Sequence, residues 1–204
     1  MKLVYILFLT HVTFYWSAVL FYIYFYKQNT KNWFRVTKQV LCNQILFTPV
    51  YILPYEYYPT PLSTEHIFWQ LPLIIVLTDI IFYTCHRYFH YNKLLYNNIH
   101  RQHHEYDPPI AIGALHAHPI EHIFVNLFST IMPMFIVRSD MIVSIIWTII
   151  SSVNVVVAHS GTWPNDPHIA HHRYLKCNYG VGLLLMDKVL GTFKFSPITQ
   201  KRSQ

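Results

Sequence analysis

Charged residues are scarce in this sequence: Asp, Glu, Lys and Arg together make up 12% of its 204 residues. A soluble domain of this length carries about 25%, whereas 53% of the residues here are hydrophobic. Glycine is also scarce, at five residues, and the sequence contains no P-loop, dinucleotide fingerprint or G-x-S-x-G turn. The composition therefore predicts a membrane protein and argues against these soluble enzyme classes.

Cysteine is the next shortage. Cys42, Cys85 and Cys177 are far apart, odd in number and form no C-x-x-C pair. This argues against a disulfide framework and against a structural zinc site built on thiolates. Cys85 stands beside His86, but a small buried filler is the simpler interpretation.

The formal charge is +6 with histidine neutral. No long Lys/Arg run and no groove-reading motif supports nucleic-acid binding. Cytosolic loops of a membrane protein carry such an excess by the positive-inside rule, which is the interpretation we adopt.

Long apolar runs define the expected spans. Leu3 to Tyr26 is long enough to cross the ~30 Å hydrocarbon core and is expected to remain as an uncleaved first helix. Residues 27–39 are basic and predict a cytosolic loop or interfacial helix. The apolar stretch from Val40 to Leu53 contains Pro49 and is short, which favours a tilted, kinked or re-entrant helix.

Three further spans follow. Ile67 to Tyr83 leads into the first histidine group, and Ile120–Val137 with Met141–Ala158 predicts a hairpin that turns at residues 138–140. If the basic 27–39 segment is cytosolic, every histidine group falls on that same membrane face. The expected architecture is all-α, with about four transmembrane helices and a cytosolic helical cap.

Histidine is what the sequence has in excess, with 14 residues, most of them in tight groups. Imidazole is costly to bury without a partner, and a bound metal is the usual partner of many together. The spacing i, i+3, i+4 occurs twice, and an i, i+4 pair places two imidazoles on one helix face. The candidate metal ligands are His86, His90, His100, His103, His104, His118, His159, His168, His171 and His172.

Polar neighbours extend these groups. Asp79 and Tyr83 share the helix face of His86, so Asp79 could orient a ligand imidazole or could simply reach the membrane interface. His122 lies four residues after His118 and could ligate or only hydrogen-bond. Asn154, inside the last span, could support the site or bond a neighbouring helix. His11 is expected to be an ordinary polar residue of the first helix.

The ligand set is nearly all imidazole, which suits zinc, copper, iron and nickel alike. One zinc needs only three or four ligands, so about ten histidines indicate two ions. The run His104-Glu105 lacks a histidine at position 108, so a metalloprotease H-E-x-x-H motif is absent.

These blocks together resemble the fatty acid hydroxylase/sterol desaturase superfamily over roughly residues 79–195. The resemblance is carried by His86-x-x-x-His90, His100-Arg-Gln-His103-His104, His159-Ser-Gly161, His168-x-x-His171-His172, Asn178-Tyr-Gly180 and Asp187-x-x-x-Gly191. The His118-Pro-x-Glu121 block looks most similar to sterol C4-methyl oxidases, and Leu115-His-Ala-His118-Pro119 resembles sterol C5-desaturases.

The resemblance implies two iron ions held by the ten histidines, with Asp79, Tyr83, Glu121 and Asn154 as supporting residues and His122 as a possible further ligand. It also implies O₂-dependent attack on a C–H bond of a sterol or fatty acyl lipid. Electrons would come from an external cytochrome b5-type donor, and the location would be the endoplasmic reticulum membrane. The chain is expected to divide into N-terminal membrane helices with a basic loop (1–66) and a catalytic region (67–204).

Two other functions stay open. A membrane metal carrier would place ionisable groups along a path through the spans, whereas here they gather at one face. An inactive relative could keep the metal for structure alone, and the loops after His159 and His172 are short enough to suggest a trimmed cap.

Overall fold

The computed structural model describes residues 3–28, 32–53, 57, 60–162 and 167–194. All regular structure in these ranges is helical. Four helices are long and apolar enough to cross a membrane: α1 (Leu3–Tyr26), α4 (Ile67–Tyr91), the continuous helix Pro119–Val137 and α8 (Met141–Ala158). This confirms the predicted all-α membrane fold with four spans.

The first helix, α1, packs along α8, far away in the sequence. Tyr15 and Val19 are fully buried on its inner face, while Tyr5, Leu20 and Phe25 are exposed on its outer face. Apolar side chains on both faces are typical of a helix in lipid. His11 bonds Ser152 of α8 through Nδ1 at 2.8 Å, which agrees with the polar role expected for it.

The stretch after α1 forms one bent helix. It comprises α2 (Trp33–Cys42), the π-helical segment η1 (Asn43–Phe47) and α3 (Thr48–Ile52). Pro49 has no N–H to donate to the preceding turn, and the wider π turn lies directly before it. A π turn and a proline are both features that bend helices, so they favour the kinked helix among the three options offered by the sequence. The α2 part covers residues 33–39 of the basic segment.

The predicted third span is longer than expected. α4 continues from Tyr83 through His86 and His90 to Tyr91, so both histidines lie on the spanning helix itself. Asn92 ends it and caps α5 (Lys93–Asn98) by accepting from Leu94 N and Leu95 N. The 3-10 helix η3 (His100–Glu105) follows.

The predicted hairpin is also present. Its first arm comprises α6 (Pro119–Glu121), the π-helical segment η5 (His122–Leu127) and α7 (Phe128–Val137), and its second arm is α8. Arg138 makes the turn with a left-handed backbone conformation (φ 52°).

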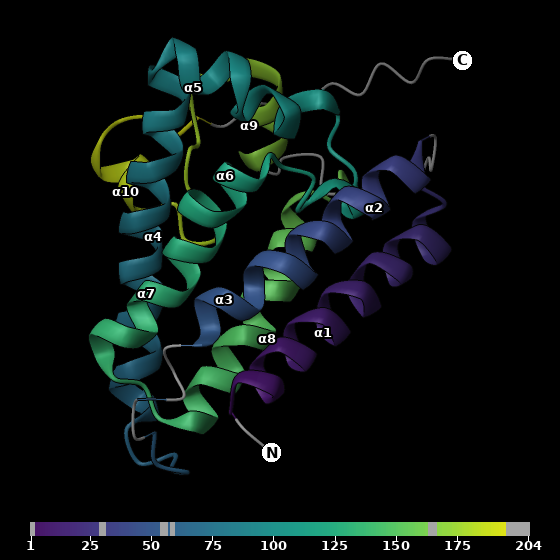
Figure 1. Ribbon diagram of the computed structural model, residues 1–204. Helices are drawn as coiled ribbons and strands as arrows, with labels where there is room; N and C mark the ends of the chain where they lie inside the picture. The colour runs from purple at the N-terminus through teal and green to yellow at the C-terminus, as the bar shows by residue number, and fades with distance from the viewer. Residues whose placement is uncertain (1–2, 29–31, 54–56, 58–59, 163–166, 195–204) are drawn as a thin grey trace.

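The two ends of the bundle differ in character. At one end lie the start of α1 and the turn between α7 and α8 (Figure 1). At the other lie α5, α9 (Pro167–Tyr174), α10 (Leu185–Val189) and the start of α6, together with the C-terminal ends of α4 and α8. The short helix η4 (Ala111–Gly113) packs against α1 and α2. All the histidine groups therefore reach the same end of the fold, as the sequence predicted.

Candidate metal centre

Nine histidines gather into two groups at this end. The five-histidine group is His86, His90, His100, His104 and His171, and the four-histidine group is His103, His159, His168 and His172. Within each group the candidate ligand atoms lie within 4.8 Å of one another. The groups adjoin, because the rings of His104 and His172 are only 4.5 Å apart.

The rings face each other through Nε2. In the five-histidine group, His86 and His100 approach to 3.1 Å, His90 and His100 to 2.7 Å, and His90 and His171 to 3.1 Å. In the four-histidine group, His159 Nε2 lies 3.1 Å from His103 Nε2 and 3.0 Å from His168 Nε2. Nitrogens bound about 2.0–2.1 Å from a single ion stand about 3 Å apart, so these separations match a shared ligand shell.

The opposite ring nitrogens of four histidines face backbone carbonyls. These Nδ1 contacts are His86 to Tyr179 O at 2.6 Å, His171 to Cys177 O at 2.8 Å, His159 to Val155 O at 2.7 Å and His172 to Tyr106 O at 3.2 Å. A carbonyl can only accept, so each of these Nδ1 atoms carries the proton. In a neutral imidazole the lone pair is then on Nε2, which points into the group.

Converging lone pairs need a cation between them. Two neutral Nε2 acceptors at about 3 Å repel each other, and His172 Nε2 is buried without a hydrogen-bond partner. The donor set is imidazole alone, fixed from outside by backbone carbonyls, which is the usual arrangement around histidine-bound transition metals. The residues present therefore fit metal ions in both groups.

Burial keeps these imidazoles neutral. It lowers the pKa of His103, His104 and His168 well below the ordinary value, and the neighbouring imidazoles lower it further. Burial is also the main reason that the pKa of His159 is lowered to about 4, although its hydrogen bond to Val155 O acts in the opposite direction. Neutral imidazole is the form that binds a metal.

Glu121 contacts the site directly. Its Oε1 lies 2.8 Å from His100 Nδ1, and both side chains are almost fully buried. A carboxylate on the outer nitrogen of a ligand imidazole fixes the ring and makes it a stronger donor. This is the kind of support that the sequence suggested for Glu121.

Asp79 has partners different from those the sequence suggested. Its carboxylate accepts from Leu185 N at 3.2 Å and Met186 N at 2.8 Å, so it binds the first turn of α10 rather than an imidazole. The sequence had left two roles open for Asp79, an imidazole partner or the membrane interface, and neither is the contact observed, because α10 lies over 100 residues away in the sequence. Tyr83 likewise bonds the segment that follows α10, because its hydroxyl lies 3.1 Å from Thr192 Oγ1.

Asp187, for which sequence analysis predicted no separate role, holds the loop beside His86. Its two oxygens accept from Tyr179 N at 2.9 Å and Gly180 N at 2.6 Å. Gly180 is required here because a Cβ would lie 2.9 Å from Asp187 Oδ2. Since Tyr179 O accepts from His86, Asp187 fixes a ligand through one peptide unit.

Replacing Asp187 with Asn should lower metal affinity about tenfold, because the new amide NH₂ faces an N–H donor and releases the Tyr179 loop. Competition with a chelator measures this. Asp107→Asn is the matched control, since Asp107 is exposed and meets only Arg173 at 3.4 Å. Equal affinity in both variants would contradict this role.

His118 does not join either group. Its Nδ1 accepts from Ile120 N at 3.2 Å and so caps α6, and the residue is partly exposed. The position before Pro119, where the helix begins, directs the ring to its own backbone. The expectation that His118 is a ligand therefore has no geometric support, and nine of the ten candidates are brought together.

His122 also lies outside the groups. It is buried, and its Nε2 is 3.5 Å from Thr48 Oγ1. Together with Asn154 it lines a cavity between the spans. The sequence also left out His116, whose Nε2 lies 3.0 Å from Glu105 Oε2, while Arg35 pairs with Glu105 from α2. No spacing rule could have linked residues 35, 105 and 116.

The fold and site define a helical protein with four helices apolar enough to span a membrane among its described residues, and with two buried, imidazole-only groups at one end of its bundle that could hold metal ions. The fatty acid hydroxylase family model matches residues 71–192. The chain belongs to this family.

Its relatives act on different lipids, as their names state. It is 36% identical to fatty acid hydroxylase ahd1 of Mycosarcoma maydis over 67% of this chain and 37% of that protein. It is 31% identical to methylsterol monooxygenase 2-2 of Arabidopsis thaliana over 67% of this chain and 56% of the relative. It is also 31% identical to the very-long-chain aldehyde decarbonylase GL1-11 of Oryza sativa subsp. indica, over 82% and 72%.

The chain spans between 37% and 56% of the length of the first three curated relatives that it matches. No solved structure matches it.

Proposed function

We propose that this protein is an O₂-dependent lipid oxidase, a hydroxylase or desaturase, that acts on a C–H bond of a sterol or fatty acyl lipid at a two-iron centre. The observation that carries the proposal is the convergence of nine histidine Nε2 atoms in two adjoining groups. Zinc would fit the same nitrogens. Family membership favours iron, because the relatives named above include a hydroxylase and a monooxygenase.

The chain itself contributes positioning. His86 and His171 are held by the carbonyls of Tyr179 and Cys177, and Glu121 Oε1 lies 2.8 Å from His100 Nδ1. These contacts fix the rings before a metal arrives, so little reorganisation is needed on binding. Bound iron would supply the redox chemistry and O₂ activation that no amino-acid side chain provides.

The spans contribute access for a lipid. A cavity of about 280 Å³ lies between them, and its lining includes Phe82, whose ring is 5.1 Å from that of His86. Val155, whose carbonyl accepts from His159, lines it as well. A lipid in this cavity would lie beside both histidine groups and away from water, which protects a reactive oxidant.

The basic residues support a cytosolic metal centre. Lys93, Arg101 and Arg173 stand on the helices of the histidine end, and Arg35 on α2 contacts Glu105 there. By the positive-inside rule this end faces the cytosol. We further propose the endoplasmic reticulum as the membrane and a separate cytochrome b5-type protein as the electron donor, both in keeping with the family.

Turnover decides between this function and its two alternatives. Protein purified with iron would receive ¹⁸O₂, a reductant with an electron carrier, and a mixed sterol and fatty acyl lipid extract. Mass spectrometry should find a lipid that gains one ¹⁸O atom or loses two hydrogens, and His103→Ala protein should produce neither. Protein that binds two irons but changes no lipid would instead favour a carrier or an inactive relative.

A further inference from the structure

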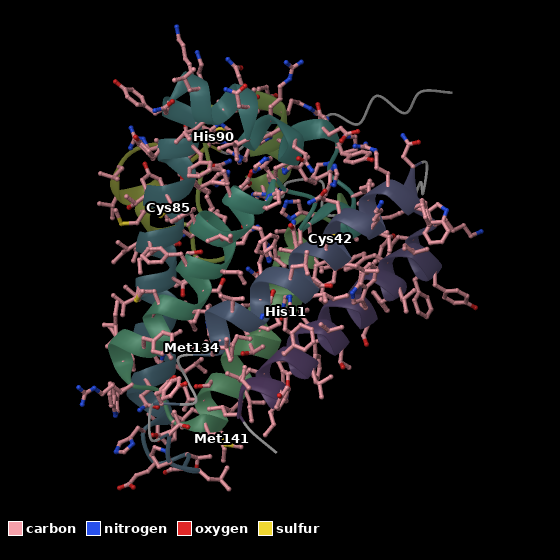
Figure 2. The ribbon with its side chains drawn as sticks, viewed as in Figure 1. His11, Cys42, Cys85, His90, Met134 and Met141 are labelled. Carbon is pink, nitrogen blue, oxygen red and sulfur yellow. The ribbon has the colours of Figure 1, made fainter. Side chains whose placement is uncertain are left out.

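Polar side chains lie deep among the apolar spans, away from the metal centre. Figure 2 shows His90 at the histidine end of the bundle and His11 about midway along it, between the helices. His11 lines the 280 Å³ cavity, as do Thr48, Ser152 and His122. Most of the wall is apolar and includes Ile75, Ile131, Met134 and Trp147.

Three of the polar groups in this wall lack a hydrogen-bond partner. They are His122 Nδ1, Asn126 Nδ2 and Thr78 Oγ1, and all three atoms are buried. Other hydroxyls of the wall are satisfied by backbone carbonyls of their own helix, as Thr148 and Ser152 are at 2.8 Å and 2.6 Å. Buried polar groups are normally paired, so these three indicate a ligand with a polar atom of its own.

The local backbone supports this assignment. His122 and Asn126 lie on the π-helical segment η5, and Thr48 follows the π-helical segment η1. π turns are rare and appear frequently at functional sites, because they re-aim side chains within a helix. The segments η1 and η5 contact each other, and Thr48, His122 and Asn126 line the same cavity.

The lining also limits the charge of that ligand. Among the described residues that form the cavity wall there is no Asp, Glu, Lys or Arg. A carboxylate or phosphate held here would be buried without a counter-ion, at a cost of several kcal/mol. A hydroxyl can both donate and accept, and so can satisfy an amide NH₂ and an imidazole nitrogen together.

We infer that this cavity binds a neutral lipid through a single hydroxyl group, held by His122, Asn126 and Thr78. This inference rests on the proposed function and narrows its substrate class to lipid alcohols, in which the hydroxyl anchors the molecule within the membrane. His122 follows Glu121, the residue that contacts His100, so the anchoring helix also supports the metal centre.

Binding without turnover tests this. The full chain, loaded with metal in nanodiscs, is labelled with a diazirine analogue of hexadecan-1-ol, and the labelled residues are mapped by mass spectrometry. Unlabelled hexadecan-1-ol, cholesterol, hexadecane and hexadecanoate then compete. Hexadecan-1-ol or cholesterol should displace the probe at about tenfold lower concentration than hexadecane or hexadecanoate, the preference that one or two net hydrogen bonds supply. Comparing hexadecan-1-ol with cholesterol shows whether a linear or a ring-containing alcohol fits the cavity better.

In Asn126→Leu and His122→Phe, the ratio of the alkane concentration to the alcohol concentration that displaces the probe should fall to about one. Comparing this ratio between variants cancels the partitioning of each competitor into the lipid. Ser151→Ala is the matched control, because Ser151 lines the same cavity but donates to Thr148 O. Equal displacement by alkane and alcohol in the wild type, a preference for hexadecanoate, or an unchanged ratio in both variants would overturn the inference. Metal content is measured in the same samples: protein that prefers the alcohol but holds no metal would refute the proposed function alone.

Discussion

Alanine at His103 or His171 is expected to lower bound metal from about two ions per chain to one or fewer. Each replacement removes one Nε2 from a different group, and leaves the facing nitrogens, such as His159 Nε2 or His90 Nε2, without a shared cation. Loss of affinity at the affected position should exceed about 100-fold, since even residues that only support a ligand cost 10–100-fold. Metal per chain is measured by mass spectrometry after purification with iron and zinc both available.

His118→Ala is the control that the structure provides. His118 belongs to the same sequence pattern but caps α6 through Nδ1, so its replacement should leave both metals bound. A His118 variant that loses metal as His103→Ala does would show that the ligand set differs from the two groups described above. Wild-type protein that folds without any metal would refute the metal centre itself.

The sequence predicted the parts of the fold that depend on local pattern. Apolar runs of span length gave α1, α8 and the hairpin turn at Arg138, because hydrophobic length and turn residues are local properties. The i, i+4 spacing of His86 and His90 placed both rings on one face of α4, as the structure shows.

The misplaced residues depend on tertiary contacts. His118 matched the pattern, but a residue just before a helix-starting proline can cap its own helix. Asp79 was placed beside an imidazole only because it shares the helix face of His86, whereas its partners are the N–H groups of Leu185 and Met186. Periodicity along one helix cannot reveal a contact with a segment that approaches it from the far end of the chain.

The π-helical segments are another such case. Residues 43–47 and 122–127 lie within predominantly apolar stretches that predict ordinary helix, yet both segments are π-helical, with one more residue in the hydrogen-bonded turn. Gln44 and His122 lie on these segments and are buried, and Gln44 bonds Trp16 and His11. Spacing along the chain predicted that His122 lies one turn from His118, but it could not predict that His11 of α1 bonds Ser152 and Gln44, because those contacts join helices far apart in sequence.

Glu121→Ala should lower metal affinity up to about 100-fold, and Glu121→Gln about tenfold. In the first variant His100 Nδ1 loses the carboxyl oxygen that lies 2.8 Å from it in a fully buried position, while in the second an amide oxygen can take the place of that oxygen. Chelator competition gives the affinities, and thermal unfolding of the metal-free proteins separates a weaker site from a weaker fold. Glu65→Gln, on the exposed loop at the opposite end, is the matched control. If Glu121→Ala bound metal as tightly as the control, the carboxylate would be a packing residue of the α6 turn, and the orientation of His100 would have to come from the neighbouring rings alone.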